Sequence, residues 1–354
     1  MKRNMKEISF LILSVFISLN VISQVNKNGK VVKNNENSNA SGPKKHTWFE
    51  PSKIWLDTDG KPINAHAAGI LFSKGKYYWF GEIKKGKTII VGNIQRTDAG
   101  GISCYSSTDL CNWKFESVAL EPGTKDIASD IHKSKIIERP KVIFNEKTKK
   151  FVMWMHIDTR DYSYARAGVA TADKPEGPYT YLGSFRPNNQ MSRDQTLFKD
   201  DNGKAYQFAS SENNKTMYIN ELTDDYLRPS GKFKRIFIDL EREAPAVVKH
   251  NNKYFIISSA CNGWAPTKAM YAISDSIMGV YKVMGNPCTG KDSDITFYSQ
   301  STYILPVEGK DNTYISLFDL WKSENLEDSR YVWLPMHFEN DKMIIEWKES
   351  WELK

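Results

Sequence analysis

Five polar side chains recur at the same place in a repeated segment of this chain. Each begins a run rich in Val, Ile, Leu and Phe, and an aromatic residue follows 11 to 14 positions later, after a turn rich in Lys, Asn and Gly. The five are His66, Glu138, Asp194, Glu243 and Gln300. Three of them are carboxylic acids, and clustered carboxylates raise one another's pKa. Such a cluster can keep a general acid protonated near neutral pH.

Two positioned carboxyl groups are the basic equipment for hydrolysing a glycosidic bond. One protonates the leaving oxygen, and the other activates water or attacks the sugar. Aromatic residues make up 12% of the chain, and exposed rings would offer flat faces for sugars. Tyr162, Tyr164, Trp264 and Trp321 fall in segments that we expect to be loops, although each could equally be packed inside the fold. The recurring acids therefore suggest a hydrolase that acts on carbohydrate.

The elements that must position these side chains are short β-strands. Runs of Val, Ile, Tyr, Phe and Trp alternate with turns of Gly, Asn, Asp and Lys, and no long segment has a helical period. A second motif, strand, acidic turn and strand, follows several of the repeated hairpins. It occupies residues 105–113, 171–181, 219–231 and 273–283.

Each repeated unit thus supplies about four short strands, which is one blade of a β-propeller. Five units predict an all-β fold, a five-bladed β-propeller. A β-sandwich is the main alternative, but it would not repeat a polar residue at the same place in every unit. The first strand of a propeller blade runs along the central axis. We therefore expect the five polar side chains to meet at one mouth of the central channel.

The N-terminal residues predict export. A basic start is followed by an apolar run that ends near Ser23, the pattern of a signal peptide over residues 1–23. This run is shorter than the ~20 residues that cross a bilayer, so we expect no membrane span in the mature chain and a periplasmic or secreted location. Residues 24–45 are rich in Asn, Lys, Ser and Gly and predict a flexible linker. Residues 46–354 then form the propeller, which we expect to be catalytic.

Charge and cysteine content exclude other classes. The formal net charge is +7, but acidic and basic residues are interspersed, so nucleic-acid binding is not expected. In an oxidising compartment the four cysteines could form disulfides, and the short-loop pairings are Cys104–Cys111 and Cys261–Cys288, of which we favour the second. No C-x-x-C motif occurs, so no zinc or redox site is expected.

Several ordered motifs resemble those of glycoside hydrolase family 43. They are INAHAAGILFSKGKYYWFGE, ERPKVIFN with KFVMWMH, SRDQTLFKDDNGKAYQFASSENN, REAPAVVKHNNKYFIISSACNGWAP and YSQST. The resemblance covers residues 48–354 and is greatest to the exo-β-1,3-galactanase branch (subfamily 24) or the neighbouring subfamily 34.

The resemblance implies roles for individual residues. Glu243 in REAP matches the family's general acid, and Asp194 in SRD matches the carboxylate that raises the pKa of that acid and orients it. Glu138 in ERPK and Gln300 in SQST match positions implicated in water activation or substrate holding.

The general base is less clear from the resemblance. Elsewhere in the family an aspartate in the first blade is the base, but residues 64–67 here read Asn-Ala-His-Ala, a departure that also marks the galactanase branch. Glu138, His66 and Gln300 remain candidates. Gln300 could act only as an imidic tautomer or by positioning water.

Further positions match residues that contact substrate in the family. They are His66, Glu82, Tyr162, Glu212, Asn213, Gly263 and Trp264. No cofactor is required. Ca²⁺ in the central channel is known in parts of the family, but no spaced ligand loop in this sequence indicates one.

The function that the resemblance implies is an inverting, exo-acting glycosidase that releases galactose from β-1,3-galactan, as in arabinogalactan side chains. An α-L-arabinofuranosidase or a β-xylosidase on the same fold is the nearest alternative. A carbohydrate-binding propeller without catalysis is the alternative from another class, and the missing first-blade aspartate motivates it. In every case the partner is an oligo- or polysaccharide.

Overall fold

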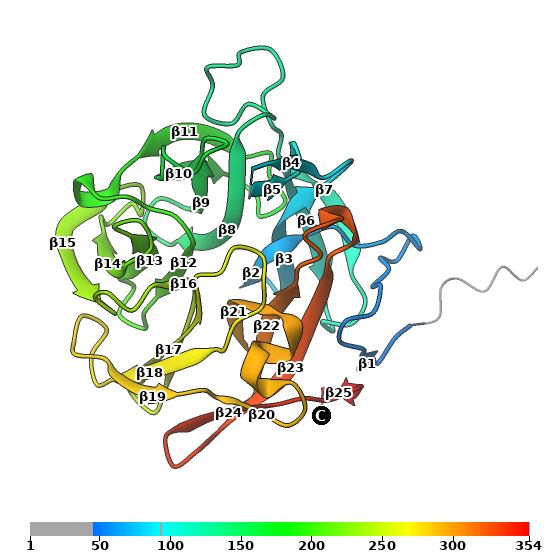
Figure 1. The fold of residues 1–354 in the computed structure, drawn as a ribbon, viewed down its shortest axis with the longest axis vertical. Coiled ribbons are helices and arrows are strands. Elements are labelled where there is room, and N and C mark those ends of the chain that lie inside the picture. The colour runs from blue at the N-terminus through cyan, green and yellow to red at the C-terminus, as the bar shows by residue number, and fades with distance from the viewer. Residues whose placement is uncertain (1–44, 93, 354) are drawn as a thin grey trace, which may run out of the picture. The chain divides into compact units, whose positions relative to one another are not determined.

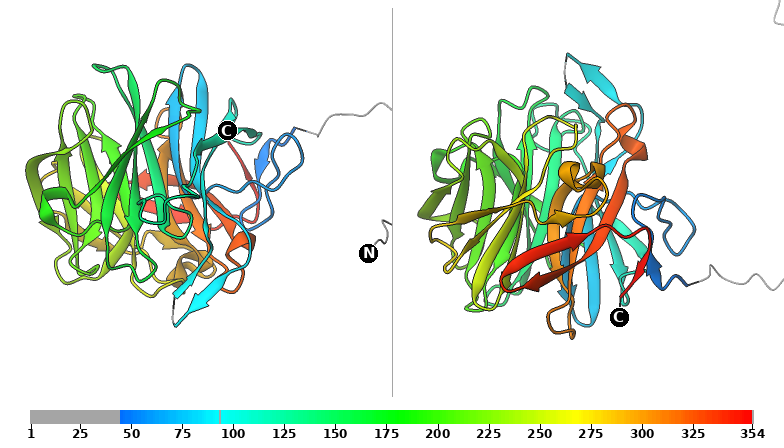
Figure 2. Two further views of the ribbon diagram at one scale, coloured as in Figure 1. Left: turned by 90° about the horizontal axis from the view of Figure 1, so that it is seen from above. Right: turned by 60° about the horizontal axis from the view of Figure 1, so that its bottom comes forward.

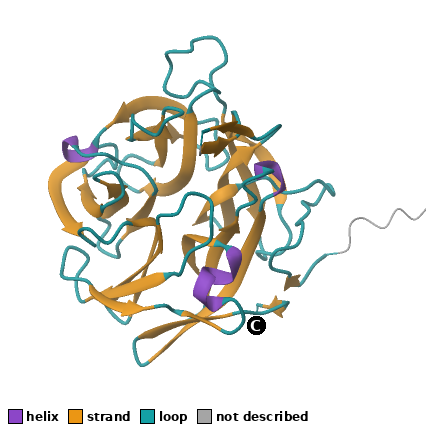
Figure 3. Ribbon diagram, viewed as in Figure 1, coloured by secondary structure: helices purple, strands orange, loops and turns teal. Residues whose placement is uncertain are grey.

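β-Strands arranged in five sheets around a common axis make up most of the protein (Figures 1 and 3). The computed structural model describes residues 45–92 and 94–353. The predicted signal peptide and all but the last residue of the predicted linker lie outside the described residues. Within the described part of the chain, no helix is long and apolar enough to cross a membrane. The predicted five-bladed β-propeller is confirmed.

Each sheet is one blade, with consecutive strands paired antiparallel from the axis outwards. The first blade contains β2 (His66–Ser73), β3 (Lys76–Lys84), β6 (Ala99–Ser107) and β7 (Lys114–Leu120), and the second contains β8 (Ile136–Asn145), β9 (Lys150–Asp158), β10 (Arg166–Ala172) and β11 (Thr180–Phe185). The third contains β12 (Gln195–Lys199), β13 (Ala205–Ser211), β14 (Thr216–Leu222) and β15 (Pro229–Ile236), and the fourth contains β16 (Arg242–His250), β17 (Lys253–Ala260), β18 (Met270–Ser274) and β19 (Lys282–Gly285). The fifth contains β21 (Gln300–Pro306), β22 (Tyr314–Leu320), β23 (Arg330–Glu339), β24 (Lys342–Glu346) and the parallel edge strand β20 (Cys288–Thr289).

Several short strands and 3₁₀ helices do not belong to the five blades. They are the pair β1 (Trp48–Phe49) and β25 (Trp351–Glu352), the hairpin β4 (Ile89–Val91) and β5 (Ile94–Arg96), and the 3₁₀ helices η1 (Pro187–Asn189), η2 (Ser293–Tyr298) and η3 (Leu326–Asp328). The β4–β5 hairpin projects from the first blade (Figure 2).

The innermost strands form a closed ring. β2 contacts β8, β8 contacts β12, β12 contacts β16, β16 contacts β21, and β21 returns to β2. The recurring polar residues lie at the start of these strands. His66 and Gln300 are the first residues of β2 and β21. Glu138 is the third residue of β8, Glu243 is the second residue of β16, and Asp194 directly precedes β12. The sequence repeat is therefore also a repeat in space.

A β-bulge follows the polar residue in three of the inner strands. The pairing register shifts after His66, after Glu138 and after Glu243. The next residue in each strand, Ala67, Arg139 or Ala244, has a positive φ of 50° to 55°. Bulges of this kind change the direction in which a side chain points and are common beside active sites.

The ring closes through a core shared by the first and last blades. Trp79 and Trp113 of the first blade pack with Tyr331 and Trp333 of the fifth, and the ring centroids of Trp79 and Trp333 are 4.6 Å apart. The Tyr331 hydroxyl donates to the carbonyl oxygen of Ile63 over 3.0 Å. Strands β1 and β25 pair beside this cluster, so both ends of the described chain meet there.

The predicted disulfides are wrong, because all four cysteines are free. Cys104 is buried in the core between the first and second blades, and Cys111 packs at the edge of the core between the first and fifth. Cys288 is buried in the core between the fourth and fifth blades, whereas Cys261 lines a polar cavity. The two cysteines of each predicted pair therefore lie in different surroundings: Cys104 and Cys111 belong to different interblade cores, and Cys288 is in a core whereas Cys261 is in the cavity.

Candidate active site

A cavity of about 330 Å³ opens where the inner strands begin. Its lining consists of Glu82, Ile94, Glu138, Arg139, His156, Tyr162, Arg193, Asp194, Asn214, Glu243, Cys261, Gly263, Trp264, Gln300 and Trp321. Among the residues matched to catalytic or substrate-contacting positions, the structure brings eight together here: Glu243, Asp194, Glu138, Gln300, Glu82, Tyr162, Gly263 and Trp264. Three others, His66, Glu212 and Asn213, do not line it. Of the other two loop aromatics named from the sequence, Trp321 also lines the cavity and Tyr164 does not.

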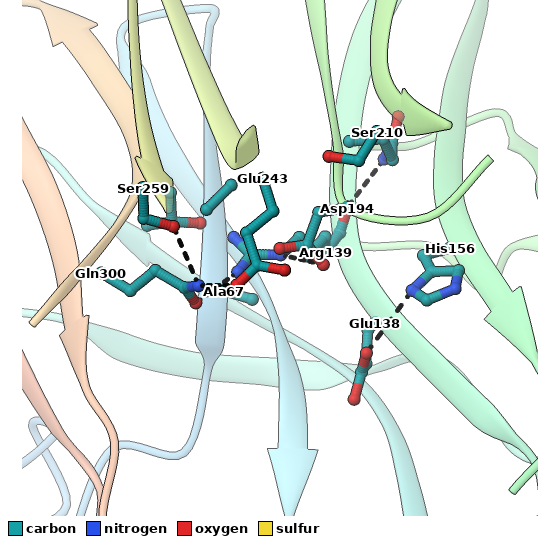
Figure 4. A network of polar contacts seen from close by, with 12 residues as sticks. Ala67, Glu138, Arg139, His156, Asp194, Ser210, Glu243, Ser259 and Gln300 are labelled. Atoms are coloured by element: carbon teal, nitrogen blue, oxygen red, sulfur yellow. Dashed lines mark hydrogen bonds and ion pairs between the residues drawn. The ribbon is translucent and has the colours of Figure 1, made fainter. Parts of the chain in front are cut away.

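Glu243 is held by two amides. Its Oε1 accepts a hydrogen bond from Nε2 of Gln300 over 2.9 Å (Figure 4). Its Oε2 accepts one from Nδ2 of Asn214 over 3.1 Å. Burial and the negative charge of Asp194 raise the pKa of Glu243 to about 8. This carboxyl group therefore carries a proton at neutral pH and can give it to a leaving group.

Arg139 connects the groups around Glu243. Its Nε lies 2.7 Å from Oδ1 of Asp194, and its Nη2 donates to Oε1 of Gln300 over 2.6 Å. Its Nη1 donates to the carbonyl oxygen of Ser301 over 3.2 Å. Burial works to lower the pKa of Arg139, but Asp194 raises it above its ordinary value. The positively charged Arg139 thus links the carboxylate of Asp194 to Gln300, which lies beside Glu243.

Glu138, in contrast to Glu243, lies among positively charged side chains. Its oxygens lie 3.4 Å from Nζ of Lys84 and 3.5 Å from Nδ1 of His156, and Oε1 accepts from the Tyr162 hydroxyl over 3.2 Å. Burial would raise the pKa of Glu138, but Lys84 and His156 outweigh it and lower the pKa to about 2. Glu138 is therefore an ionised carboxylate in the same cavity as a protonated one.

His156 and Asp158 support this ionised state. Nε2 of His156 lies 2.8 Å from Oδ2 of Asp158, whose Oδ1 accepts from the backbone N–H groups of Thr159 and Ala165. Burial alone would lower the pKa of His156, but its hydrogen bond with Asp158 and the nearby carboxylate of Glu138 raise it to about 9. The imidazole is thus a buried cation at neutral pH.

Glu82 shares Lys84 with Glu138. Oε2 of Glu82 lies 2.8 Å from the Lys84 ammonium. Burial, with a contribution from the charge of Glu138, raises the pKa of Glu82 to about 7 despite the opposing effect of Lys84. The same ammonium lies 5.2 Å and 5.5 Å from the ring centroids of Trp264 and Trp321.

Trp264 and Trp321 form one aromatic wall of the cavity. Their rings meet edge to face at 4.9 Å. Nε1 of Trp264, in the loop after β17, donates to the carbonyl oxygen of Gln95 in the β4–β5 hairpin over 2.9 Å. Ile94 of the same hairpin also lines the cavity. The first and fourth blades therefore meet over one side of the site.

The three predicted residues outside the cavity have partners elsewhere. His66 is 1% exposed, with Nδ1 3.3 Å from Oδ1 of Asp319 and its ring stacked on Tyr331 at 5.0 Å. The Glu212 carboxylate accepts hydrogen bonds from Thr216, Tyr218 and Arg235. Oδ1 of Asn213 accepts from Arg193.

Asn214 is the residue of that turn which reaches the acid. Residues 212, 213 and 214 all have a positive φ, of 51°, 55° and 65°. Three successive left-handed residues turn the chain so that the third side chain enters the cavity. The motif SSENN located this turn but not the residue in it that contacts Glu243.

Sequence reasoning missed several lining residues, namely Ile94, Arg139, His156, Arg193, Asn214 and Cys261. It also missed Lys84, which pairs with two of the lining carboxylates. Lys84, Arg139 and His156 share a signal that could have found them. Each is a charged or titratable residue inside an otherwise buried strand. Buried charges are paired or functional, so a cation in such a strand indicates a nearby carboxylate.

The donor set in the cavity does not suit Ca²⁺. Within the described chain, ligand atoms of Glu138, His156 and Asp194 lie within 4.8 Å of one another. However, His156 is held as a cation and Asp194 is paired with Arg139, whereas Ca²⁺ prefers oxygen ligands only. Deeper among the inner strands, Nζ of buried Lys141 donates to the carbonyl oxygen of Ala67 over 2.9 Å.

Several known proteins have this fold and a similar sequence. The family model described as glycosyl hydrolases family 43 matches residues 70–301. A search among curated protein sequences gave no match. A solved family 43 β-1,3-galactosidase with galactodeoxynojirimycin is 42% identical, with a TM-score of 0.81 over 86% of this chain and 100% of that chain.

Two solved exo-β-1,3-galactanases are also similar. The enzyme from Phanerochaete chrysosporium, solved with β-1,3-galactotriose, is 35% identical, with a TM-score of 0.79 over 87% of this chain and 68% of that chain. The enzyme from Clostridium thermocellum is 33% identical, with a TM-score of 0.77 over 86% of this chain and 66% of that chain. The chain therefore belongs to glycosyl hydrolase family 43.

Proposed function

We propose that this protein is an exo-acting, inverting glycosidase that releases galactose from the ends of β-1,3-linked galactan. The observation that carries the proposal is Glu243, a half-buried carboxyl group with a pKa of about 8, facing a cavity that also holds the ionised Glu138. Galactodeoxynojirimycin and β-1,3-galactotriose, bound in two of the similar structures, support galactose as the sugar.

The two acids divide the reaction between them. Glu243 gives its proton to the glycosidic oxygen as the bond from that oxygen to C1 breaks. Water attacks C1 from the opposite face and loses a proton, and the ionised Glu138 is a carboxylate of the cavity that can receive it. Asp194 keeps Glu243 protonated, because a second negative charge beside the first is unfavourable.

The size of the cavity supports action at chain ends. Its volume of about 330 Å³ lies at the lower limit of the roughly 300–1,000 Å³ typical of ligand pockets. Trp264, held by the β4–β5 hairpin, forms one side of it. A terminal sugar fits such a pocket better than the middle of a polymer does.

The proposed location is outside the cytoplasm, either periplasmic or secreted. The N-terminal pattern of a signal peptide supports this location, as does a polysaccharide substrate. N-terminal sequencing of the mature chain, recovered from the periplasm or medium of its expressing host, tests it. A chain recovered with residues 1–23 still attached would contradict it.

The experiment that tests the activity is product analysis with β-1,3-galactobiose and a panel of arabinogalactan fragments. We expect galactose, released first as its α-anomer and detected by NMR. Glu243→Gln removes the proton donor and should lower kcat by about 10³-fold or more while the protein stays folded. Release of pentoses instead would indicate an arabinofuranosidase or xylosidase, and saturable binding without hydrolysis would indicate a binding propeller.

A further inference from the structure

We infer that Gln300 is a positioning residue for the acid Glu243, acting through an amide of fixed orientation, and that it is not the group that activates water. This inference rests on the proposed function and assigns a task within the same site. It is carried by the hydrogen bonds around the Gln300 side chain and by the kinds of group that make them.

All the hydrogen-bonding capacity of the Gln300 amide is used inside the protein. Its Oε1 accepts from Nη2 of Arg139 over 2.6 Å and from Nε1 of Trp321 over 3.0 Å. Its Nε2 donates to Oε1 of Glu243 over 2.9 Å and to Oγ of Ser259 over 3.1 Å (Figure 4). A primary amide has two acceptor lone pairs and two N–H donors, so neither end has a free position for water.

The chemistry of the neighbours fixes which way the amide points. Arginine and tryptophan side chains can only donate hydrogen bonds. The oxygen of Gln300 must therefore face Arg139 and Trp321, because a flipped amide would direct its N–H groups at two donors. The NH₂ group is thereby directed at Glu243.

The same neighbours oppose the tautomer that a base would require. An imidic acid carries a proton on Oε1 and a lone pair on Nε2. The proton would face the guanidinium of Arg139 and the indole N–H of Trp321, which cannot accept it. The nitrogen lone pair would face Glu243 and Ser259 rather than a water in the cavity.

The arrangement instead orients the proton donor. Gln300 holds one carboxyl oxygen of Glu243 and Asn214 holds the other. Arg139 contacts both Gln300 and Asp194. The residue that orients Glu243 and the residue that raises its pKa are therefore held by the same side chain. Small errors in the aim of a catalytic group cost about 10²-fold in rate.

Leaving-group dependence separates aiming the acid from activating water. β-1,3-Galactobiose has a poor leaving group and needs protonation, whereas dinitrophenyl β-galactoside departs as a stable anion and needs little. For Gln300→Met we expect kcat/KM to fall about 10²-fold on the first substrate and less than about 10-fold on the second. Glu243→Gln should show the same selective loss.

Two further variants control for misfolding and for the loss of a buried amide in general. Gln300→Glu keeps an oxygen for Arg139 and Trp321 but has no N–H for Glu243, so it should show the same selectivity even if the methionine variant does not fold. Gln207→Met removes a buried amide that bonds Ser192 and Asn220 outside the site, and the ratio between the two substrates should stay at the wild-type value.

An equal loss on both substrates would overturn the inference, because a base or a water-positioning group serves both reactions alike. Rescue of Gln300→Met by azide, with α-galactosyl azide as the product, would also overturn it. A wild-type protein that hydrolyses neither substrate would refute the proposed function as well. A wild-type protein active on both, with equal losses in the variant, would refute the inference alone.

Discussion

Two glutamates in one cavity hold opposite protonation states because their neighbours differ. Removal of Glu243 from solvent and the nearby carboxylate of Asp194 raise its pKa to about 8, although the hydrogen bond from Gln300 works against this. Glu138 faces Lys84 and a cationic His156, so its pKa falls to about 2. Environment, rather than residue type, assigns the acid and the ionised carboxylate.

This difference predicts the pH dependence of the reaction. The acid form of Glu243 is present below a pKa of about 8 and is lost above it, so kcat/KM on β-1,3-galactobiose should fall as the pH rises through 8. Asp194→Asn removes the negative charge that raises this pKa and leaves Arg139 without its partner. The alkaline limb should therefore move by about one unit to lower pH.

The control for this prediction is Asp224→Asn. Asp224 is an exposed carboxylate that pairs with Lys147 away from the cavity. Its variant should keep the wild-type pH profile. An alkaline limb that stays in place in Asp194→Asn would mean that Asp194 does not set the protonation of the acid.

At the scale of the elements, the β-bulges explain both what the sequence predicts and what it conceals. In a regular strand, Glu138 and Arg139 would point to opposite faces. The bulge after Glu138, with Arg139 at φ 52°, lets both side chains reach the cavity. Strand alternation is readable from sequence, but a bulge is not, and Arg139 was therefore missed.

His66 is the opposite case, a residue that was predicted to reach the cavity and does not. It occupies the same place in β2 as Glu138 does in β8 and is followed by a similar bulge. Nevertheless, its ring packs against the fifth blade, where it stacks on Tyr331 and where Asp319 offers it a buried partner. A contact between residues that are 253 positions apart has no local signature in the sequence.

Gly81 in β3 is a point where two elements approach too closely for any side chain. A Cβ atom there would lie 2.1 Å from the backbone carbonyl carbon of Ala65, and backbone atoms cannot move aside without shifting β2. We expect Gly81→Ala to lower the free energy of unfolding by about 1–3 kcal/mol or more. Thermal and denaturant unfolding measure the change.

Gly123→Ala is the matched control. A Cβ at Gly123 would meet its nearest neighbours at ordinary contact distances of 3.6 Å or more. This variant should unfold within about 0.5 kcal/mol of the wild type. Equal stability of the two alanine variants would show that β2 and β3 can move apart without cost.

For the whole molecule, the repeat in the sequence was sufficient to predict the number of blades and their order. It did not predict how the ring closes. Strands β1 and β25 are two residues long, too short to show any alternation of polar and apolar residues. The separation of the four sulfurs could not be predicted either, because it depends on whether each segment enters an interblade core or the cavity.

Trp351 is the side chain that tests this closure. Its ring stacks on Phe49 with centroids 4.2 Å apart, and its Nε1 donates to the carbonyl oxygen of Trp333 over 2.8 Å. Because the ring is only half-buried, Trp351→Ala should lower the free energy of unfolding by about 2 kcal/mol, roughly half the cost for a fully buried tryptophan. Val280→Ala, at a side chain that is 83% exposed, should change it little, and equal effects would contradict the assigned role.

The core shared by the first and last blades also sets the order in which the chain can fold. Trp79 and Trp113 leave the ribosome long before Tyr331 and Trp333, with which they pack. Until those last partners emerge, the first blade has an uncovered cluster of indole rings and cannot complete its core. Such long-range closure slows folding, and a prematurely terminated chain would present these rings to chaperones and proteases. Completion of synthesis is therefore a condition for the first blade to become stable.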